Sequence, residues 1–125
     1  MRLRGSVVLA TIMLFAALPA LGVTIPHNEA LYKGDDARLD SRITYHADGY
    51  PVSRVLADIS NATGVVMQAG IDDQDWMVYD RKVIVHVKEM KLQTLMEELS
   101  SVLHFHWSRG GEEGKWTYRL WQDKL

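Results

Sequence analysis

The sequence contains no cysteine, and this absence sets the first limits on its chemistry. Without a thiol there is no disulfide, no thiolate nucleophile and no zinc–thiolate centre. A lipid-modified N-terminus of the bacterial lipoprotein kind is excluded too, because it requires a cysteine after the leader. The stability of the folded chain must therefore come from packing and hydrogen bonding.

Long apolar runs are also lacking, apart from one near the start of the chain. Two arginines precede the apolar stretch Val7–Leu18, which is shorter than the roughly 20 residues needed to span a bilayer. Small residues follow at Ala20 and Gly22, a pattern that a signal peptidase reads. We predict that residues 1–22 are a secretory signal peptide cleaved after Gly22. The alternative is an uncleaved N-terminal anchor, which would then be the only contact with a membrane.

An excess of positive charge is absent as well. Once the predicted signal is removed, 16 acidic residues face 12 basic ones, because the total of 14 basic residues includes two arginines in the signal. A nucleic acid surface needs a basic stripe, so we expect no nucleic acid partner. The remaining length of about 103 residues suffices for one domain. We divide it into a flexible linker over residues 23–41, which lacks periodicity, and a domain over residues 42–123.

Within residues 42–123, apolar spacing predicts alternating strands and helices. A period of two marks strands, as at Ile43 and Tyr45, and a helical spacing begins at Val52 and Val55. The expected elements, in chain order, are a strand at residues 43–46, a turn at Asp48-Gly49, a helix from Pro51 to the stop at Gly64, a strand at 65–67, a polar loop at 70–81, a strand at 83–87, a helix at 92–103, a strand at 105–107, a turn at 109–114 and a strand at 115–122.

The two halves of this region can be laid on each other with a shift of about 40 residues and no gap. Apolar positions then coincide over about 25 residues, and His46 coincides with His86. A duplicated unit explains this agreement better than two unrelated amphipathic segments. We therefore predict an α+β fold made of a duplicated β-α-β unit, with the order βαββαββ and two helices packed against small mixed β-sheets.

This pattern resembles the short N-terminal domain shared by secretins and TonB-dependent receptors, and the resemblance spans nearly the whole predicted mature chain. A domain that follows anti-sigma-factor regulators shows a similar pattern. The resemblance consists of hydrophobic spacings and one Thr-Gly, and it carries no catalytic signature. The residues that carry it are Ile43-Thr44-Tyr45, Pro51-Val52, Val55-Leu56, Ile59, Thr63-Gly64-Val65-Val66, Val83–Val87, Met90–Leu92, Leu95, Leu99, Val102-Leu103 and Trp116–Leu120.

The resemblance implies a function in protein contacts. Family members serve in ring assembly and partner docking in secretins, and in contact with an anti-sigma regulator in receptors. We therefore expect an exported, non-catalytic protein-interaction module of the cell envelope, located in the periplasm or at the outer membrane. Its partner would be a secretin, pilus or anti-sigma-type component. Channel formation is not carried over, because about 103 residues leave no room for a plug, a barrel or a secretin pore.

Four histidines are the candidates for a metal site. His104 and His106 are expected to share one face of a strand, and His46 and His86 occupy equivalent places in the two halves. The sequence places no carboxylate to complete such a set, so we expect no bound metal or other cofactor. The alternative function is a small periplasmic metal- or ligand-binding carrier that uses these surface histidines.

Patterns typical of an enzyme are missing from the sequence. The acids in Asp72–Asp80 lack the spacing of a calcium loop. Glu97-Glu98 and Glu112-Glu113 are expected on the surface, whereas the carboxylates of a glycosidase need burial. The helical serines lack the Gly-x-Ser-x-Gly turn that exposes a nucleophile. We therefore expect no enzymatic activity.

Aromatic residues cluster in the final hairpin. Alternation places Trp116 and Tyr118 on one face, which we expect to fill the core, and Arg119 and Trp121 on the opposite face. We predict that Trp121 and Arg119 contact the protein partner, and that the last strand accepts another strand if it lies at a sheet edge. Packing alone is the alternative explanation for these aromatic residues.

Overall fold

A computed structural model of the chain describes residues 9–13, 31, 34–70 and 75–122. The predicted α+β fold class and the order βαββαββ are confirmed, and they correspond to the elements from β2 to β6 with the short helix α2 added. Two further elements, β1 and η2, precede them. The elements are β1 (Leu9–Met13), the 3-10 helix η2 (Ala37–Asp40), β2 (Arg42–Pro51), α1 (Val52–Thr63), β3 (Met67–Ala69), α2 (Trp76–Tyr79), β4 (Lys82–Lys91), α3 (Leu92–Leu103), β5 (His106–Gly110) and β6 (Thr117–Trp121).

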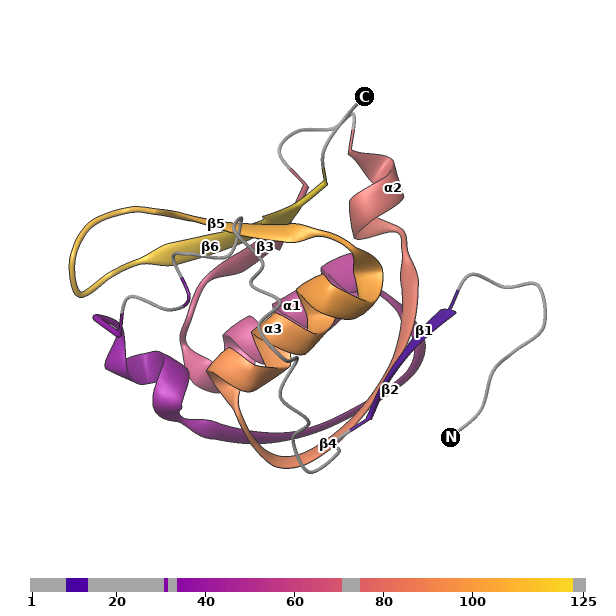
Figure 1. Cartoon of the computed structure of the whole chain (residues 1–125), viewed down its shortest axis with the longest axis horizontal. Helices are drawn as coiled ribbons and strands as arrows, with labels where there is room; N and C mark the ends of the chain where they lie inside the picture. Colours follow the sequence, from indigo (N-terminus) through magenta and orange to yellow (C-terminus); the bar gives the residue numbers. More distant parts are fainter. Residues whose placement is uncertain (1–8, 14–30, 32–33, 71–74, 123–125) are drawn as a thin grey trace, which may run out of the picture.

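The strands form two small sheets of three strands each. Sheet A has the order β1-β4-β2, and sheet B has the order β3-β6-β5. Both sheets are mixed, because β1 runs parallel to β4 and β3 runs parallel to β6, whereas β2–β4 and β5–β6 are antiparallel pairs. Figure 1 shows α1 and α3 in the middle of the molecule, between sheet B at the top and sheet A at the bottom. Each β-α-β unit therefore starts in sheet A and ends in sheet B.

The duplication predicted from the sequence is visible residue by residue in the two units. β2 and β4 have the same length of 10 residues, and α1 and α3 have the same length of 12. Pro51 and Lys91 cap the N-termini of the helices, and Gly64 and His104 cap their C-termini. Each bound in the second unit lies about 40 residues after its counterpart in the first, which is the shift found in the sequence. The second unit therefore repeats the secondary structure of the first.

The duplicated positions also share a left-handed backbone. Gly64 ends α1 with a φ of 78°, and His104 ends α3 with a φ of 59°. Glycine adopts this conformation without the steric cost that a Cβ atom adds, so histidine is the strained choice at a C-cap. The pair Gly49 and Glu89 repeats the pattern, with φ values of 79° and 49°.

The turn predicted at Asp48-Gly49 is wrong. β2 continues without interruption from Arg42 to Pro51, and the pairing with β4 shifts register between Asp48 and Tyr50. The left-handed backbone of Gly49 is therefore absorbed as a β-bulge inside a longer strand. Local turn chemistry at this site is overridden by pairing with β4.

Strand β3 begins later than the sequence predicts, at Met67 instead of Val65. The Val65 amide donates to Thr63 Oγ1 at 3.2 Å, so it is held by the last residue of α1 and is not part of the β3 ladder. The final strand is also shorter than predicted, because β6 covers only Thr117–Trp121.

The core lies between the two sheets and is formed mainly by the inner faces of the helices and strands. Trp107 is the largest of the fully buried side chains, and its Nε1 donates to the Met96 carbonyl at 2.7 Å. Burial of these apolar groups is the main driving force for folding. The core comprises Leu31, Leu39, Ile43, Ala47, Val52, Val55, Leu56, Ile59, Val65, Met67, Val78, Val83, Val85, Val87, Met90, Leu92, Leu95, Met96, Leu99, Leu103, Phe105, Trp107, Tyr118 and Leu120.

The segment predicted as a linker contributes to this core in its described part. Leu31 and Leu39 are buried, and η2 packs near α3. The domain therefore begins before Arg42, and the linker prediction does not describe residues 34–41. Within the predicted signal, the described residues Leu9–Met13 form β1. The remainder of residues 1–33, including the predicted cleavage position, lies outside the described residues apart from Leu31.

The region predicted as a polar loop contains the short helix α2. Val78 is buried, and helix α2 lies against α1. The acids Asp72 and Asp73 lie outside the described residues, whereas Asp75 is buried and Asp80 is exposed. Among the described residues, no helix combines the length and the apolar character needed to cross a membrane.

Candidate interaction surfaces

The outer face of sheet B carries the two residues predicted to contact a partner. Along β6, Tyr118 and Leu120 are buried while Arg119 and Trp121 are partly exposed, as the alternation predicts. His106 on β5 is the cross-strand partner of Trp121, and the centroids of the two rings lie 4.9 Å apart. We call the set Gln68, His106, Ser108, Arg119 and Trp121 the sheet B face.

Contacts with β3 hold Arg119 in place on this face. Its Nη2 donates to Gln68 Oε1 at 2.6 Å, and its Nη1 donates to the Gly70 carbonyl. Because the guanidinium is tied to the neighbouring strand, its side chain loses little further freedom on binding a partner. The position of Trp121 is similarly restricted by the ring of His106.

The last strand is not a sheet edge. β6 pairs with β3 on one side and with β5 on the other, so both of its backbone edges are already used. The conditional prediction that the last strand accepts another strand is therefore excluded. A partner can approach Trp121 and Arg119 only through their side chains, across the face of the sheet.

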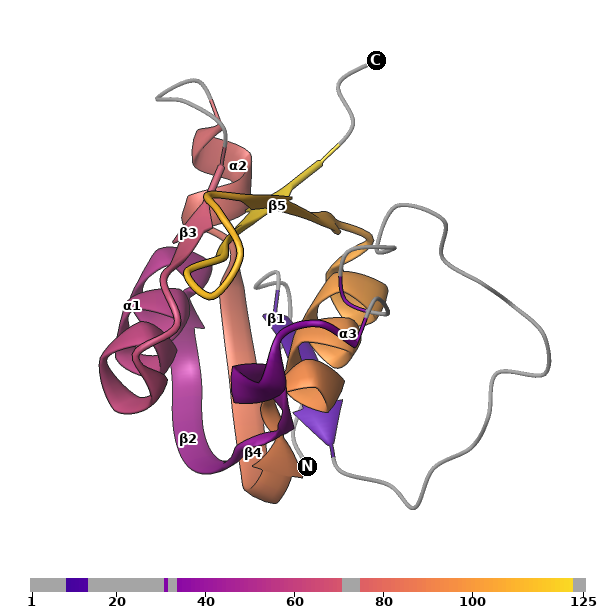
Figure 2. The same ribbon diagram turned by 90° about the vertical axis from the view of Figure 1, so that its left-hand side faces the viewer.

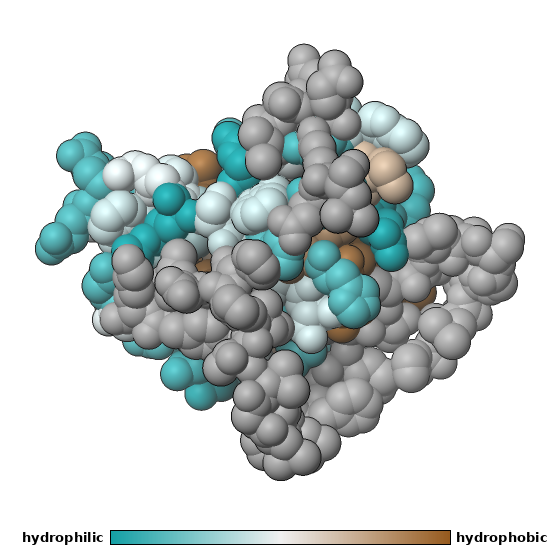
Figure 3. All heavy atoms as spheres, turned by 45° about the horizontal axis from the view of Figure 1, so that its top comes forward, coloured by the Kyte–Doolittle hydropathy of each residue, from teal (hydrophilic) through white to brown (hydrophobic). Residues whose placement is uncertain are grey.

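The surface on this side of the molecule has a mixed polar character. Figure 3 shows hydrophilic and intermediate residues interspersed, with only scattered hydrophobic ones. Interfaces of proteins that also exist alone are about as polar as the rest of their surface, with aromatic and arginine residues enriched at the contact. The sheet B face has this composition.

A second exposed aromatic lies on α2 and was missed by the sequence analysis. The exposed fractions of Trp76 and Met77 are 58% and 53%, the highest among the large hydrophobic residues described. The sequence offered a signal only in the apolar run Trp76–Tyr79, which the surrounding acids obscured. Trp76 provides a useful comparison for Trp121, because it is the same residue type at a different place on the surface.

The structure brings together two of the four candidate histidines. His46 on β2 and His86 on β4 are cross-strand partners, with ring centroids 5.1 Å apart. The two histidines are equivalent positions of the duplicated units, and the antiparallel register of β2 and β4 also places them opposite each other. Asp48 lies beside them, and its Oδ1 is 2.7 Å from His86 Nε2. A metal bound to this nitrogen would have to replace its hydrogen bond with Asp48.

The other two histidines lie elsewhere and do not form the predicted pair. His104 is the C-cap of α3 with a left-handed backbone, and only His106 belongs to β5. The prediction that they share one face of a strand is therefore wrong, because the helix end rotates His104 out of the strand. His46 and His86 belong to sheet A and His106 to sheet B. Within the described residues, no group of three or more His, Asp or Glu side chains has the arrangement of a metal site.

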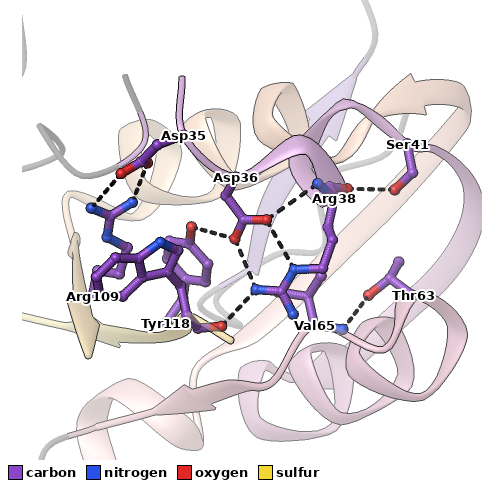
Figure 4. A network of polar contacts seen from close by, with 9 residues as sticks. Asp35, Asp36, Arg38, Ser41, Thr63, Val65, Arg109 and Tyr118 are labelled. Carbon is purple, nitrogen blue, oxygen red and sulfur yellow. Dashed lines mark hydrogen bonds and ion pairs between the residues drawn. The ribbon is translucent and has the colours of Figure 1, made fainter. Parts of the chain in front are cut away.

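A polar cluster fastens the segment before β2 to the final hairpin (Figure 4). Asp36 receives hydrogen bonds from Arg38 Nε at 2.9 Å, from Arg38 Nη2 at 2.8 Å and from the Tyr118 hydroxyl at 2.8 Å. Arg38 Nη2 also donates to the Trp116 carbonyl at 2.7 Å. We call Asp36, Arg38 and Tyr118, with the adjoining pair Asp35 and Arg109, the N-terminal clasp.

Electrostatics in the clasp follow from these contacts. The hydrogen bonds from Arg38 hold the pKa of Asp36 below its ordinary value, although burial opposes this effect. Burial, together with the hydrogen bond to Asp36, raises the pKa of Tyr118 to about 12. Arg109 lies with its guanidinium carbon 3.9 Å from the centroid of the Trp116 ring and donates to Asp35 at 2.5 Å. These contacts join the segment before β2 to the final hairpin.

No family model matches this sequence, and the comparisons with curated proteins and with solved structures give no significant match.

Proposed function

We propose that this chain is an exported, non-catalytic protein-interaction module of the cell envelope, of the kind that the short N-terminal domain of secretins and TonB-dependent receptors represents. The proposal draws on the doubled β-α-β unit, on the basic and apolar start of the chain, and on the hydrophobic spacings shared with that family. Its partner would be a secretin, pilus or anti-sigma-type component in the periplasm or at the outer membrane.

The observation that carries the proposal is the position of Trp121 on the sheet B face. Trp107 on β5 is directed into the core, whereas Trp121 on the central strand β6 lies on the opposite face of the sheet and rests on His106. Arg119 beside it adds a fixed cation. Tryptophan and arginine are the residue types that most often dominate the binding energy of an interface.

The test is a capture experiment followed by affinity measurements. The tagged chain is cross-linked in envelope extract and the captured proteins are identified by mass spectrometry. Binding of the identified partner is then measured for the wild type, for Trp121→Ala and for Trp76→Ala. We expect Trp121→Ala to weaken binding by about 30-fold or more, the effect of losing at least ~2 kcal/mol at an interface anchor, with an unchanged circular dichroism spectrum.

Trp76→Ala is the matched control, because it removes an exposed tryptophan from α2. It should leave the affinity within about twofold of the wild type. If Trp76→Ala abolishes binding and Trp121→Ala does not, the interaction lies at α2 and the assignment to the sheet B face is wrong. Capture of no partner at all would contradict the proposed function itself.

The pairing of His46 with His86 favours a second candidate, a small periplasmic metal- or ligand-binding carrier. Thermal unfolding with zinc or copper present tests it, because a ligand that binds only the folded state raises the midpoint. His46→Ala should remove any such rise, whereas His104→Ala, in the other location, should not. An unchanged midpoint of the wild type with either metal would eliminate this candidate.

A further inference from the structure

Strand β1 occupies one edge of β4 with a segment that belongs to the predicted signal peptide. Five residues, Leu9–Met13, run parallel to β4, from Leu9 opposite Lys82 to Met13 opposite His86. β1 also lies against α3 (Figures 1 and 2). Removal of residues 1–22 would therefore leave a free backbone edge on β4 with the flank of α3 beside it.

We propose that this edge of β4 is a strand-acceptor site, filled in the processed protein by an extended, uncharged segment of a partner protein that runs parallel to β4. The inference rests on the proposed function and adds a second surface to it, distinct from the sheet B face. The N-terminal strand shows which occupant fits, because Leu-Ala-Thr-Ile-Met has no charge and contains no proline.

Without β1, β4 would become an edge strand of sheet A, because only β2 would still pair with it. Its exposed positions are almost all charged, and charged side chains, lysine above all, are one device that limits pairing at an open edge. Lysines at the ends of an edge strand suppress indiscriminate pairing with other chains, and here they leave the β-branched centre Val83–Val87 available. The exposed positions are Lys82, His86, Lys88, Glu89 and Lys91.

Ile84 is a buried apolar residue of β4 beside this edge. It alternates with the core residues Val83 and Val85 and therefore faces the other side of the sheet, outside the main core. Nevertheless its exposed fraction is only 6%. In the register of the pair, Ile84 lies opposite Thr11 of β1. Backbone hydrogen bonds give a strand-acceptor site its affinity, and contacts with apolar side chains, for which Ile84 is the candidate here, would give it selectivity.

The first experiment opens the edge in the full chain. Proline cannot donate a ladder hydrogen bond, so Thr11→Pro should release β1, and Thr24→Pro, outside β1, is the matched control. Hydrogen exchange is measured for the peptide that covers residues 82–86. We expect exchange roughly tenfold faster in Thr11→Pro than in the wild type, and no change in the control. If Thr11→Pro unfolds the domain, β1 is an integral strand and the proposal is overturned.

The second experiment fills the edge in trans. The probe is a peptide in which Leu-Ala-Thr-Ile-Met is flanked by two glutamates on each side, which complement Lys82 and Lys88. We expect it to restore the protection of residues 82–86 in Thr11→Pro, while the same peptide with proline at its centre does not. The chain recovered from the envelope after loss of residues 1–22 should bind the probe as well.

The proposal is overturned if the probe protects residues 82–86 neither in Thr11→Pro nor in the chain that has lost residues 1–22. Recovery of the exported chain with residues 1–22 still attached would overturn it as well. The failure of the proposed function is distinguishable from either result. If capture of a partner still depends on Trp121 but the probe does not bind, only the acceptor edge is refuted. If the probe binds but no partner is captured, the strand-acceptor site at β4 is supported and the proposed partner-binding role of the sheet B face is refuted.

Discussion

Asp36→Asn isolates the contribution of the N-terminal clasp to stability. The side chain of Asp36 is only 6% exposed and binds both Arg38 and Tyr118. Asparagine keeps one acceptor oxygen, loses the charge, and directs an amide toward the donors of Arg38. A charge-assisted hydrogen bond contributes about 1.5–3 kcal/mol, and loss of one partner of a buried pair costs about 3–5 kcal/mol.

The lower part of the range for a charge-assisted hydrogen bond applies, because the Arg38 side chain is 33% exposed and can regain water. We therefore expect Asp36→Asn to lower the free energy of unfolding by about 2 kcal/mol, which corresponds to roughly 8–15 °C in the thermal midpoint for a domain of this size. Asp40→Asn is the matched control. Its ion pair with Lys91 at 3.6 Å joins side chains that are 67% and 48% exposed, so we expect a loss below about 0.5 kcal/mol.

The dependence on pH gives this prediction a second readout. Because the pKa of Asp36 is lowered in the folded state, its stabilisation is present above the ordinary value of 3.8 and is lost as the pH falls through the folded-state pKa. Urea unfolding at several pH values should therefore give a constant difference between wild type and Asp36→Asn from pH 7 to about pH 5, and a smaller difference in acid. An equal effect of Asp36→Asn and Asp40→Asn, or a difference that does not change with pH, would refute the reasoning.

Two further predictions each compare two positions: the C-caps of α1 and α3, and two neighbouring glutamates of α3. His104→Gly should raise the free energy of unfolding by about 1 kcal/mol, and Gly64→Ala should lower it by a similar amount, because the backbone is left-handed at both sites. A Cβ at Gly64 meets no atom within 4 Å, so only backbone strain changes there. Urea unfolding measures both, and a loss of stability in His104→Gly would contradict the strain argument. Burial, and secondarily the charge of Glu97, raises the pKa of Glu98, so its carboxylate lowers stability at neutral pH. Glu98→Gln should therefore raise the thermal midpoint at pH 7, by more than Glu97→Gln does, and the gain should shrink as the pH falls into the range where the carboxyl group is protonated; a gain that is the same at all pH values would refute it.

Local patterns were sufficient to predict the duplicated unit. Apolar spacing fixes which residues of a helix or strand face inward, and the two halves repeat this spacing, so α1 and α3 are found where the sequence places them. The inward and outward alternation of Tyr118 and Arg119 follows from the same rule. Tertiary contacts changed mainly the ends of elements, as at Gly49 and Val65.

Pairing between distant strands was not predictable in the same way. The central place of β6 depends on contacts with β3, about 50 residues earlier, and no short-range pattern specifies them. The clasp is a similar case, because Asp36 and Tyr118 are 82 positions apart. His46 and His86 are an informative exception. Their equivalence was visible in the sequence, and antiparallel pairing of β2 with β4 then made them neighbours.

Each β-α-β unit contributes strands to both sheets, and this has a consequence for folding. The first unit supplies β2 to sheet A and β3 to sheet B, and the second supplies β4 and β5 to the same two sheets. In sheet A, β2 pairs with β4 from the other unit, and in sheet B, β3 pairs with β6, which follows the second unit. A fragment that contains one unit alone would lack these partners for its strands. We therefore expect the duplicated halves to unfold together in one transition, although their sequences repeat.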